Sequence, residues 1–175
     1  MIKNIIVISG FIMSLSLQAQ IGISRESVSN GSVSIQFGDN ENKGLLLPYV
    51  TDKTEIIENG TIIYDTSDFK VKYLKDTNTW FDMSVDLLGT ADLSIQAADR
   101  IEQPGAKICI STTAGGTDTT KGILVLADTN KAMVLPKVAS PHLNIISPSA
   151  GMIVYDTVKR QLAVYNGTAW TFWKP

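Results

Sequence analysis

The chain has 175 residues and a formal net charge of −2, and 44% of its residues are hydrophobic and 18% charged. The low charge and the many aliphatic residues exclude a disordered tail, and the length suits one or two small domains. A mildly acidic chain without a cluster of basic residues is not expected to bind nucleic acid.

The N-terminus has the pattern of a secretory signal peptide. Lys3 precedes an apolar run from Ile5 to Leu17, and Ala19 supplies a small residue for cleavage. We therefore predict a signal peptide over residues 1–19, with an uncleaved anchoring N-terminus as the alternative. The apolar run is too short and too mixed to span a bilayer, so we expect no transmembrane segment in the mature chain. The predicted location is the periplasm, the outer membrane or the cell surface.

A first β-meander unit is predicted over residues 20–84. Residues 33–37 alternate between apolar and polar, which is typical of a half-buried strand. A short apolar run at 44–47 ends at Pro48, and residues 52–58 form either one helical turn or a loose connection. Three short strands at 61–65, 71–74 and 79–83, separated by turn residues, then predict a meander. In the strand-end sequence Tyr-Asp-Thr we expect the tyrosine to cover a sheet edge, with its hydroxyl in water.

Residues 85–121 form a connecting segment between the two units. We predict strands at 93–96 and 107–111 and a Thr/Gly-rich loop at 112–120. Cys109 is the only cysteine, so it has no disulfide partner within the chain, and its apolar neighbours predict a small buried side chain on a strand.

A second β-meander unit is predicted over residues 122–175. A strand at 122–126 opens it, and the three strands at 152–155, 161–165 and 169–173 form the meander. The pair Asn166-Gly167 predicts a two-residue type I′ hairpin turn, because both residues tolerate positive φ.

The two units are imperfect copies of each other. Lys43–Pro48 corresponds to Lys131–Pro136, Gly60–Thr66 corresponds to Gly151–Thr157, and Trp80 and Trp170 close the two copies. The predicted fold class is therefore mainly β, with two similar small antiparallel meander units joined by a β-rich middle segment and a Thr/Gly-rich linker.

Asp65 and Asp156 occupy the same place in the two copies. As turn residues they would accept backbone hydrogen bonds one or two positions further along. The alternative is a pair of catalytic carboxylates facing each other, as in a glycosidase. Because each aspartate has an equivalent in the other copy, we favour the turn interpretation and predict no enzyme activity.

The sequence offers no set of ligands for a metal or a cofactor. His142 is the only histidine and lies far from Cys109, so neither a zinc site nor a Cys-His nucleophile pair is supported. No phosphate-binding glycine loop and no nucleophile elbow is present. We predict no catalytic, cofactor-binding or metal-binding residues.

Partner contacts are sought among exposed aromatic residues and at positions where the copies differ. Trp173 and the adjacent Phe172 are candidates, as are Tyr49 and Lys137, which stand at equivalent positions after the prolines. His142 lies in a loop found only in the second copy. The alternative function is a carbohydrate-binding module, in which Trp80, Trp170 or Trp173 stacks on a sugar ring of a surface glycan.

The combination of Lys-Gly-Leu-Leu-Leu-Pro, Gly-x-Ile-x-Tyr-Asp-Thr and Tyr-Asn-Gly-Thr-x-Trp resembles a repeated C-terminal β-module of exported, fibre-like or adhesin-like surface proteins of Bacteroidota. The resemblance covers residues 43–80 and 131–170 and implies cell-surface or outer-membrane association. The hypothesis is an exported, non-enzymatic structural protein that docks on an outer-membrane or surface-fibre complex for adhesion, motility or secretion. Self-association is its natural extension, because exposed strand edges invite pairing.

Overall fold

The computed structural model describes residues 20–85, 88–94, 103, 105–112 and 118–174. Within them the protein is mainly β, with antiparallel meanders, which confirms the predicted fold class. The predicted signal peptide at 1–19 lies outside the described residues. The strands are β1 (Ile21–Ile23), β2 (Val33–Phe37), β3 (Leu45–Leu46), β4 (Tyr49–Val50), β5 (Ile62–Asp65), β6 (Lys70–Asp76), β7 (Thr79–Asp82), β8 (Ile108–Ile110), β9 (Leu124–Leu126), β10 (Ala132–Val134), β11 (Lys137–Val138), β12 (Met152–Asp156), β13 (Gln161–Tyr165) and β14 (Trp170–Trp173), with one short helix, α1 (Pro141–Asn144).

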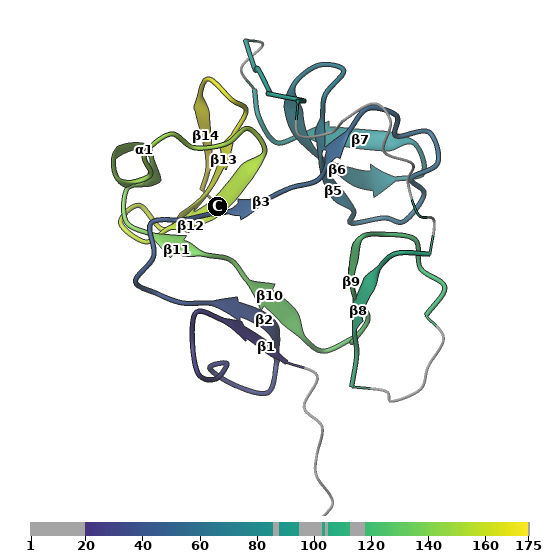
Figure 1. The fold of residues 1–175 in the computed structure, drawn as a ribbon, viewed down its shortest axis with the longest axis vertical. Coiled ribbons are helices and arrows are strands. Elements are labelled where there is room, and N and C mark those ends of the chain that lie inside the picture. Colours follow the sequence, from purple (N-terminus) through teal and green to yellow (C-terminus); the bar gives the residue numbers. More distant parts are fainter. Residues whose placement is uncertain (1–19, 86–87, 95–102, 104, 113–117, 175) are drawn as a thin grey trace, which may run out of the picture.

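The two predicted meanders form two sheets that together make the meander lobe, at the top of Figure 1. The first sheet has the order β4-β5-β6-β7, and the second has the order β11-β12-β13-β14. In both sheets the last three strands run antiparallel, as predicted from the strand and turn pattern. The sequence reading missed β4 and β11, which follow Pro48 and Pro136 and pair in parallel with β5 and β12.

The two sheets share one hydrophobic core. Its buried members come from both copies of the repeat, and Tyr64, Val71, Ile153 and Val164 stand at its centre. A second core cluster lies on the other face of the β12-β13 sheet and includes Val138, Ile145, Val154 and Ala163. Burying an aliphatic side chain of this kind contributes about 1.5–3 kcal/mol, so these two clusters stabilise the meander lobe.

Corresponding strands of the repeat take different partners. β3, from the first copy, pairs with β12 of the second, with Leu45 opposite Ile153. The corresponding strand of the second copy is β10, which pairs with β2 instead. The first copy thereby contributes β3 to the sheet of the second copy, whereas β10 of the second copy lies outside the meander lobe.

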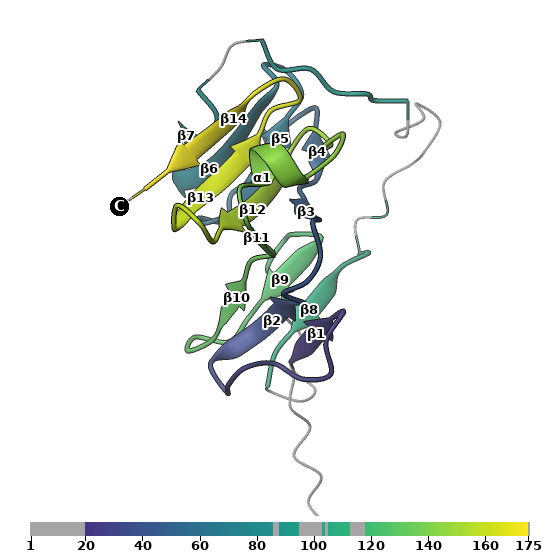
Figure 2. The same cartoon turned by 90° about the vertical axis from the view of Figure 1, so that its left-hand side faces the viewer.

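The remaining strands lie below the meander lobe in Figures 1 and 2, and we refer to them together as the parallel lobe. It consists of the three-stranded sheet β1-β2-β10 and the two-stranded sheet β8-β9. All three pairings in it are parallel. β2 is its buried strand, with Val33, Ser34, Ile35 and Gln36 each less than 5% exposed.

Several local predictions were wrong, each for a reason in the tertiary structure. Cys109 is on the predicted strand but exposed, because the described residues leave its side of the β8-β9 sheet open. Tyr64 does not reach water; its side chain is fully buried in the shared core. Leu93 and Ser94 are not in a strand, and the rest of the strand expected at 93–96 lies outside the described residues. Of the two alternatives predicted for 52–58, the structure has the loose connection.

The hairpin at Asn166-Gly167 is present, but it is not a two-residue type I′ turn. Its strands end at Tyr165 and resume at Trp170, so four residues form the loop. Gly167 has φ +103°, whereas Asn166 is not among the residues with positive φ. The Asn166 carboxamide instead accepts hydrogen bonds from the backbone N–H groups of Thr168 and Ala169, at 3.0 and 2.7 Å. An asparagine side chain can replace a backbone acceptor in a turn in this way.

Candidate interaction surface

Trp173 connects the two sheets of the meander lobe. Its indole Nε1–H donates a hydrogen bond to the Met83 carbonyl oxygen at 2.5 Å. Its ring packs against Phe81 of β7, with ring centroids 5.5 Å apart. The side chain is only partly exposed, so much of its surface is used to hold β14 against the end of the first meander.

Phe172 and His142 lie on the opposite face of β14. The edge of the His142 ring meets the Phe172 ring at 5.6 Å and 85°, which joins α1 to the sheet. Phe172 also stacks beside Trp170, with centroids 6.4 Å apart, at the margin of the second core cluster. His142 is exposed, so of these three aromatic residues it offers the most surface to a partner.

Tyr49 and Lys137 stand at equivalent positions of the repeat but make different contacts. The Tyr49 hydroxyl donates a hydrogen bond to the Ala150 carbonyl oxygen at 2.9 Å, and its ring lies 5.1 Å from that of Tyr64. Burial, together with the negative charge of Asp92, raises the pKa of the Tyr49 hydroxyl. Lys137 lies where the two lobes meet, with its Nζ 3.4 Å from the Asp39 carboxylate. The five candidates are therefore spread over different faces of the molecule and do not converge on one site.

Asp65 is a buried, charged turn residue. Its carboxylate accepts hydrogen bonds from the N–H and hydroxyl groups of Ser67, as the turn interpretation predicts. It also pairs with Lys53 at 2.6 Å and with Lys72 at 3.2 Å. Burial alone would raise the pKa of Asp65, but the hydrogen bonds from Lys53, Ser67 and Lys72 outweigh it and hold the pKa well below its usual value.

The carboxylate of Asp156 is stabilised by backbone N–H groups, whereas that of Asp65 also pairs with lysine side chains. Its carboxylate accepts hydrogen bonds from the backbone N–H groups of Val158 at 2.9 Å, Lys159 at 3.3 Å and Ser140 at 3.2 Å. Burial opposes ionisation here too, and these N–H groups lower the pKa. A general acid needs a raised pKa, so neither Asp156 nor Asp65 is suited to that role in a glycosidase.

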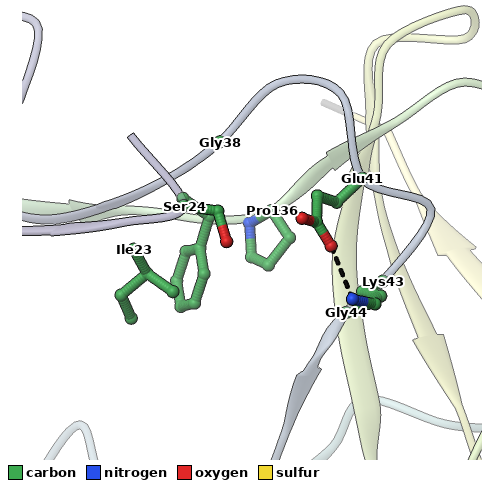
Figure 3. Close-up of a pocket in the computed structure, with 8 residues that line it drawn as sticks. Ile23, Ser24, Gly38, Glu41, Lys43, Gly44 and Pro136 are labelled. Atoms are coloured by element: carbon green, nitrogen blue, oxygen red, sulfur yellow. Dashed lines mark ion pairs between the residues drawn. The ribbon is translucent and has the colours of Figure 1, made fainter. Parts of the chain in front are cut away.

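A small open pocket of about 290 Å³ lies where β1, β2 and the start of the first repeat meet. Figure 3 shows its lining, including Ile23, Ser24, Glu41, Lys43 and Pro136. Glu41 and Lys43 form an ion pair at 2.7 Å, so these two lining charges neutralise each other. The two lining charges are therefore paired with each other, and the pocket gives no indication of a charged ligand.

The described ranges contain neither a cluster of metal ligands nor a helix that could cross a membrane. No three or more His, Cys, Asp or Glu side chains there are arranged to hold a metal ion. In the same ranges, no helix has the length and apolar character required to cross a membrane.

Comparison with known proteins gives one match. Residues 110–174 match the model of a family described as "Phage tail like trimerisation region". The match begins at the end of β8 and contains β9, β10 and the complete second meander. Comparisons with curated proteins and with solved structures found no match.

A trimerisation region is a structural element, so the match indicates a structural, non-enzymatic protein and implies self-association. Open strand edges predict self-association from the sequence, but the sequence predicts no contact surface that includes residues of the β8-β9 sheet. Lys107–Ser111 was recognised as an apolar strand, but an apolar strand is normally buried. Nothing in the local sequence signals that Ile108 is exposed.

Proposed function

We propose that this chain is an exported, non-enzymatic β-module that forms a trimer within a fibre-like or tail-like assembly of the cell envelope. The observation that carries the proposal is the trimerisation match over residues 110–174, which contains the whole second meander. The meander lobe then serves as a rigid body, because a single core ties its two sheets together.

The internal repeat supports a scaffolding role over catalysis. The residues that the copies share have structural tasks: Asp65 and Asp156 cap turns, and both keep a lowered pKa. Trp170 packs against Tyr165 at 5.1 Å. A protein that uses its repeated residues for packing and turns is suited to a load-carrying or spacing function.

Export and envelope location rest on the N-terminal sequence pattern and on the resemblance to Bacteroidota surface modules. Lys3, the apolar run and Ala19 favour passage through a secretory pathway. In this proposal the mature trimer docks on an outer-membrane or surface-fibre complex of an adhesion, motility or secretion system.

The self-association is tested by measuring the mass of residues 20–175 in solution. Light scattering after size exclusion, together with native mass spectrometry, is expected to give three times the chain mass at micromolar concentration. A chain that stays monomeric at every concentration would contradict the trimer.

Export is tested by fractionating the native cells and sequencing the N-terminus of the recovered protein. We expect recovery from the envelope or the medium, starting at Gln20. Recovery of the full chain from the cytoplasm would contradict export. A crosslinking pull-down from the same envelopes then identifies the docking partner.

The carbohydrate-binding alternative stays a prediction. Trp170 and Trp173 are partly buried and pack against Tyr165, Phe172 and Phe81. A stacking platform needs an open ring face, and these contacts occupy part of the surface that a sugar would use.

A further inference from the structure

The parallel lobe has no hydrophobic core cluster of its own among the described residues. Both clusters of buried apolar side chains belong to the meander lobe, and neither contains a residue of β1, β2, β8, β9 or β10. Parallel sheets are normally covered on both faces, and a two-stranded sheet alone is at best marginally stable. The apolar side chains of the parallel lobe that remain exposed are therefore candidates for covering by another chain.

The β8-β9 sheet carries the clearest sign of a missing cover. Ile108 lies opposite Leu124 in the parallel register, and Ile110 lies opposite Leu126. Because side chains two positions apart share a face, these four form one apolar surface. Ile110 is buried at one end of this surface, whereas Ile108 is 60% exposed and Leu124 is 42% exposed at the other. The surface thus continues from a buried end to an open one.

The three-stranded sheet of the parallel lobe has a similarly open strand, β1. Ile21 and Ile23 of β1 are about two-fifths exposed and lie on the same face, since they are two positions apart. Across the part of the chain that the structure describes, β1 pairs only with β2, and β8 and β9 pair only with each other. Such open edges with apolar neighbours are the places where strands of another chain add.

We infer that the parallel lobe is the trimer interface, with the Ile108–Leu124 surface of each copy packed against the parallel lobe of the next. The inference rests on the proposed function and names the surface that it uses. A second copy is the fitting occupant because the trimerisation match begins at Ile110 and includes β9 and β10. β1, β8 and β9 contain no charged residue, so the surface is complementary to another apolar surface and not to a charged partner.

Another pair of exposed apolar side chains lies near α1. Leu143 and Ile146, at the end of α1, are 71% and 89% exposed and also lie within the matched residues. Between them, however, Ile145 is buried in the second core cluster, so this part of the fold is already complete without a partner. The two side chains therefore make a suitable control.

The test compares two double variants of residues 20–175 by light scattering and native mass spectrometry. Ile108→Asp with Leu124→Asp is expected to reduce the mass of the particle threefold, to that of one chain. Leu143→Asp with Ile146→Asp is expected to keep the mass of the wild-type trimer. Near-UV circular dichroism of the tryptophans, which lie in the meander lobe, should be unchanged in both.

A crosslinking experiment gives an answer even where the aspartates disturb folding. In a Cys109→Ser background, Ile108→Cys treated with a short bis-maleimide is expected to give a covalent dimer on a denaturing gel. Ile146→Cys in the same background should stay monomeric on the gel.

The outcomes separate the two proposals. If the wild-type chain is a monomer, the proposed function fails. If it is a trimer that survives the Ile108/Leu124 change, or that crosslinks through position 146 and not through 108, this interface is wrong while the trimer stands.

Discussion

Tyr64 and Tyr155 occupy the same position in the two repeats, and the structure predicts a much larger loss of stability when Tyr64 loses its hydroxyl than when Tyr155 does. Tyr64 is fully buried, and its hydroxyl donates to the Asn166 carbonyl oxygen at 2.7 Å, with the Thr90 carbonyl oxygen at 3.3 Å. This bond links the first meander to the hairpin of the second. Burial, together with the charges of neighbouring groups, raises the pKa of Tyr64, so the hydroxyl remains a donor throughout the usable pH range. Tyr155 is 36% exposed.

Tyr64→Phe is expected to reduce the free energy of unfolding by about 1–2 kcal/mol. A net intramolecular hydrogen bond contributes about 0.5–1.5 kcal/mol, and a buried acceptor left without a donor costs about 1–3 kcal/mol. The Asn166 carbonyl oxygen keeps the Thr90 N–H at 3.2 Å, which places the expected loss in the lower part of that combined range. Tyr155→Phe, the matched control, is expected to change stability by less than about 0.5 kcal/mol.

Urea denaturation followed by tryptophan fluorescence measures both variants. All chains must be compared at one concentration, because the stability of an oligomer depends on it. Equal losses in the two variants, or a loss below about 0.5 kcal/mol for Tyr64→Phe, would refute the claim that this hydroxyl joins the two copies.

Two further predictions use matched or titratable positions of the repeat. Gly151→Ala should lower the free energy of unfolding by about 3 kcal/mol, because φ is +76° and the new Cβ would lie 2.9 Å from Tyr64 Cβ. Gly60→Ala should lower it by only about 1 kcal/mol, because Gly60 has φ +85° but open space around the new Cβ. Equal losses of the two variants in thermal denaturation would contradict this difference. Asp65 has a lowered folded-state pKa, so its contribution to stability is present above the ordinary pKa of about 4 and is lost as pH falls. The melting temperature of the wild type should therefore fall between pH 4 and pH 2.5 more than that of Asp65→Asn, and parallel pH profiles would contradict the assignment.

The meander strands could be predicted from the sequence because their signals are local. In 152–156 and 161–165 short apolar runs end at turn residues, and the strands lie where the pattern put them. The turn function of Asp65 and Asp156 was likewise predictable, since an aspartate at a strand end accepts the following N–H groups. These features depend on residues within a few positions of one another.

The properties that depend on distant partners could not be predicted. Tyr64 and Tyr155 share the local sequence Tyr-Asp-Thr, yet one fills the common core and the other remains partly exposed. Their difference arises from how the two sheets pack. Cys109 and Ile108 belong to an apolar run that is typical of a buried strand, and both are exposed because the β8-β9 sheet lacks a cover. A sequence pattern predicts that a surface is apolar but not which chain buries it.

The two Lys-x-apolar-apolar-apolar-Pro strands differ at their second residue and in their pairing partners. Gly44 precedes β3, which packs so closely on β12 that a Cβ at this position would lie 2.7 Å from Val154 Cγ1. The second copy has Ala132 at the equivalent position. β3 pairs with β12 in the meander lobe, whereas β10 pairs with β2 in the parallel lobe. The two copies thus contribute to one lobe with a shared core, while the β1, β8 and β9 strands of the other lobe keep apolar side chains exposed.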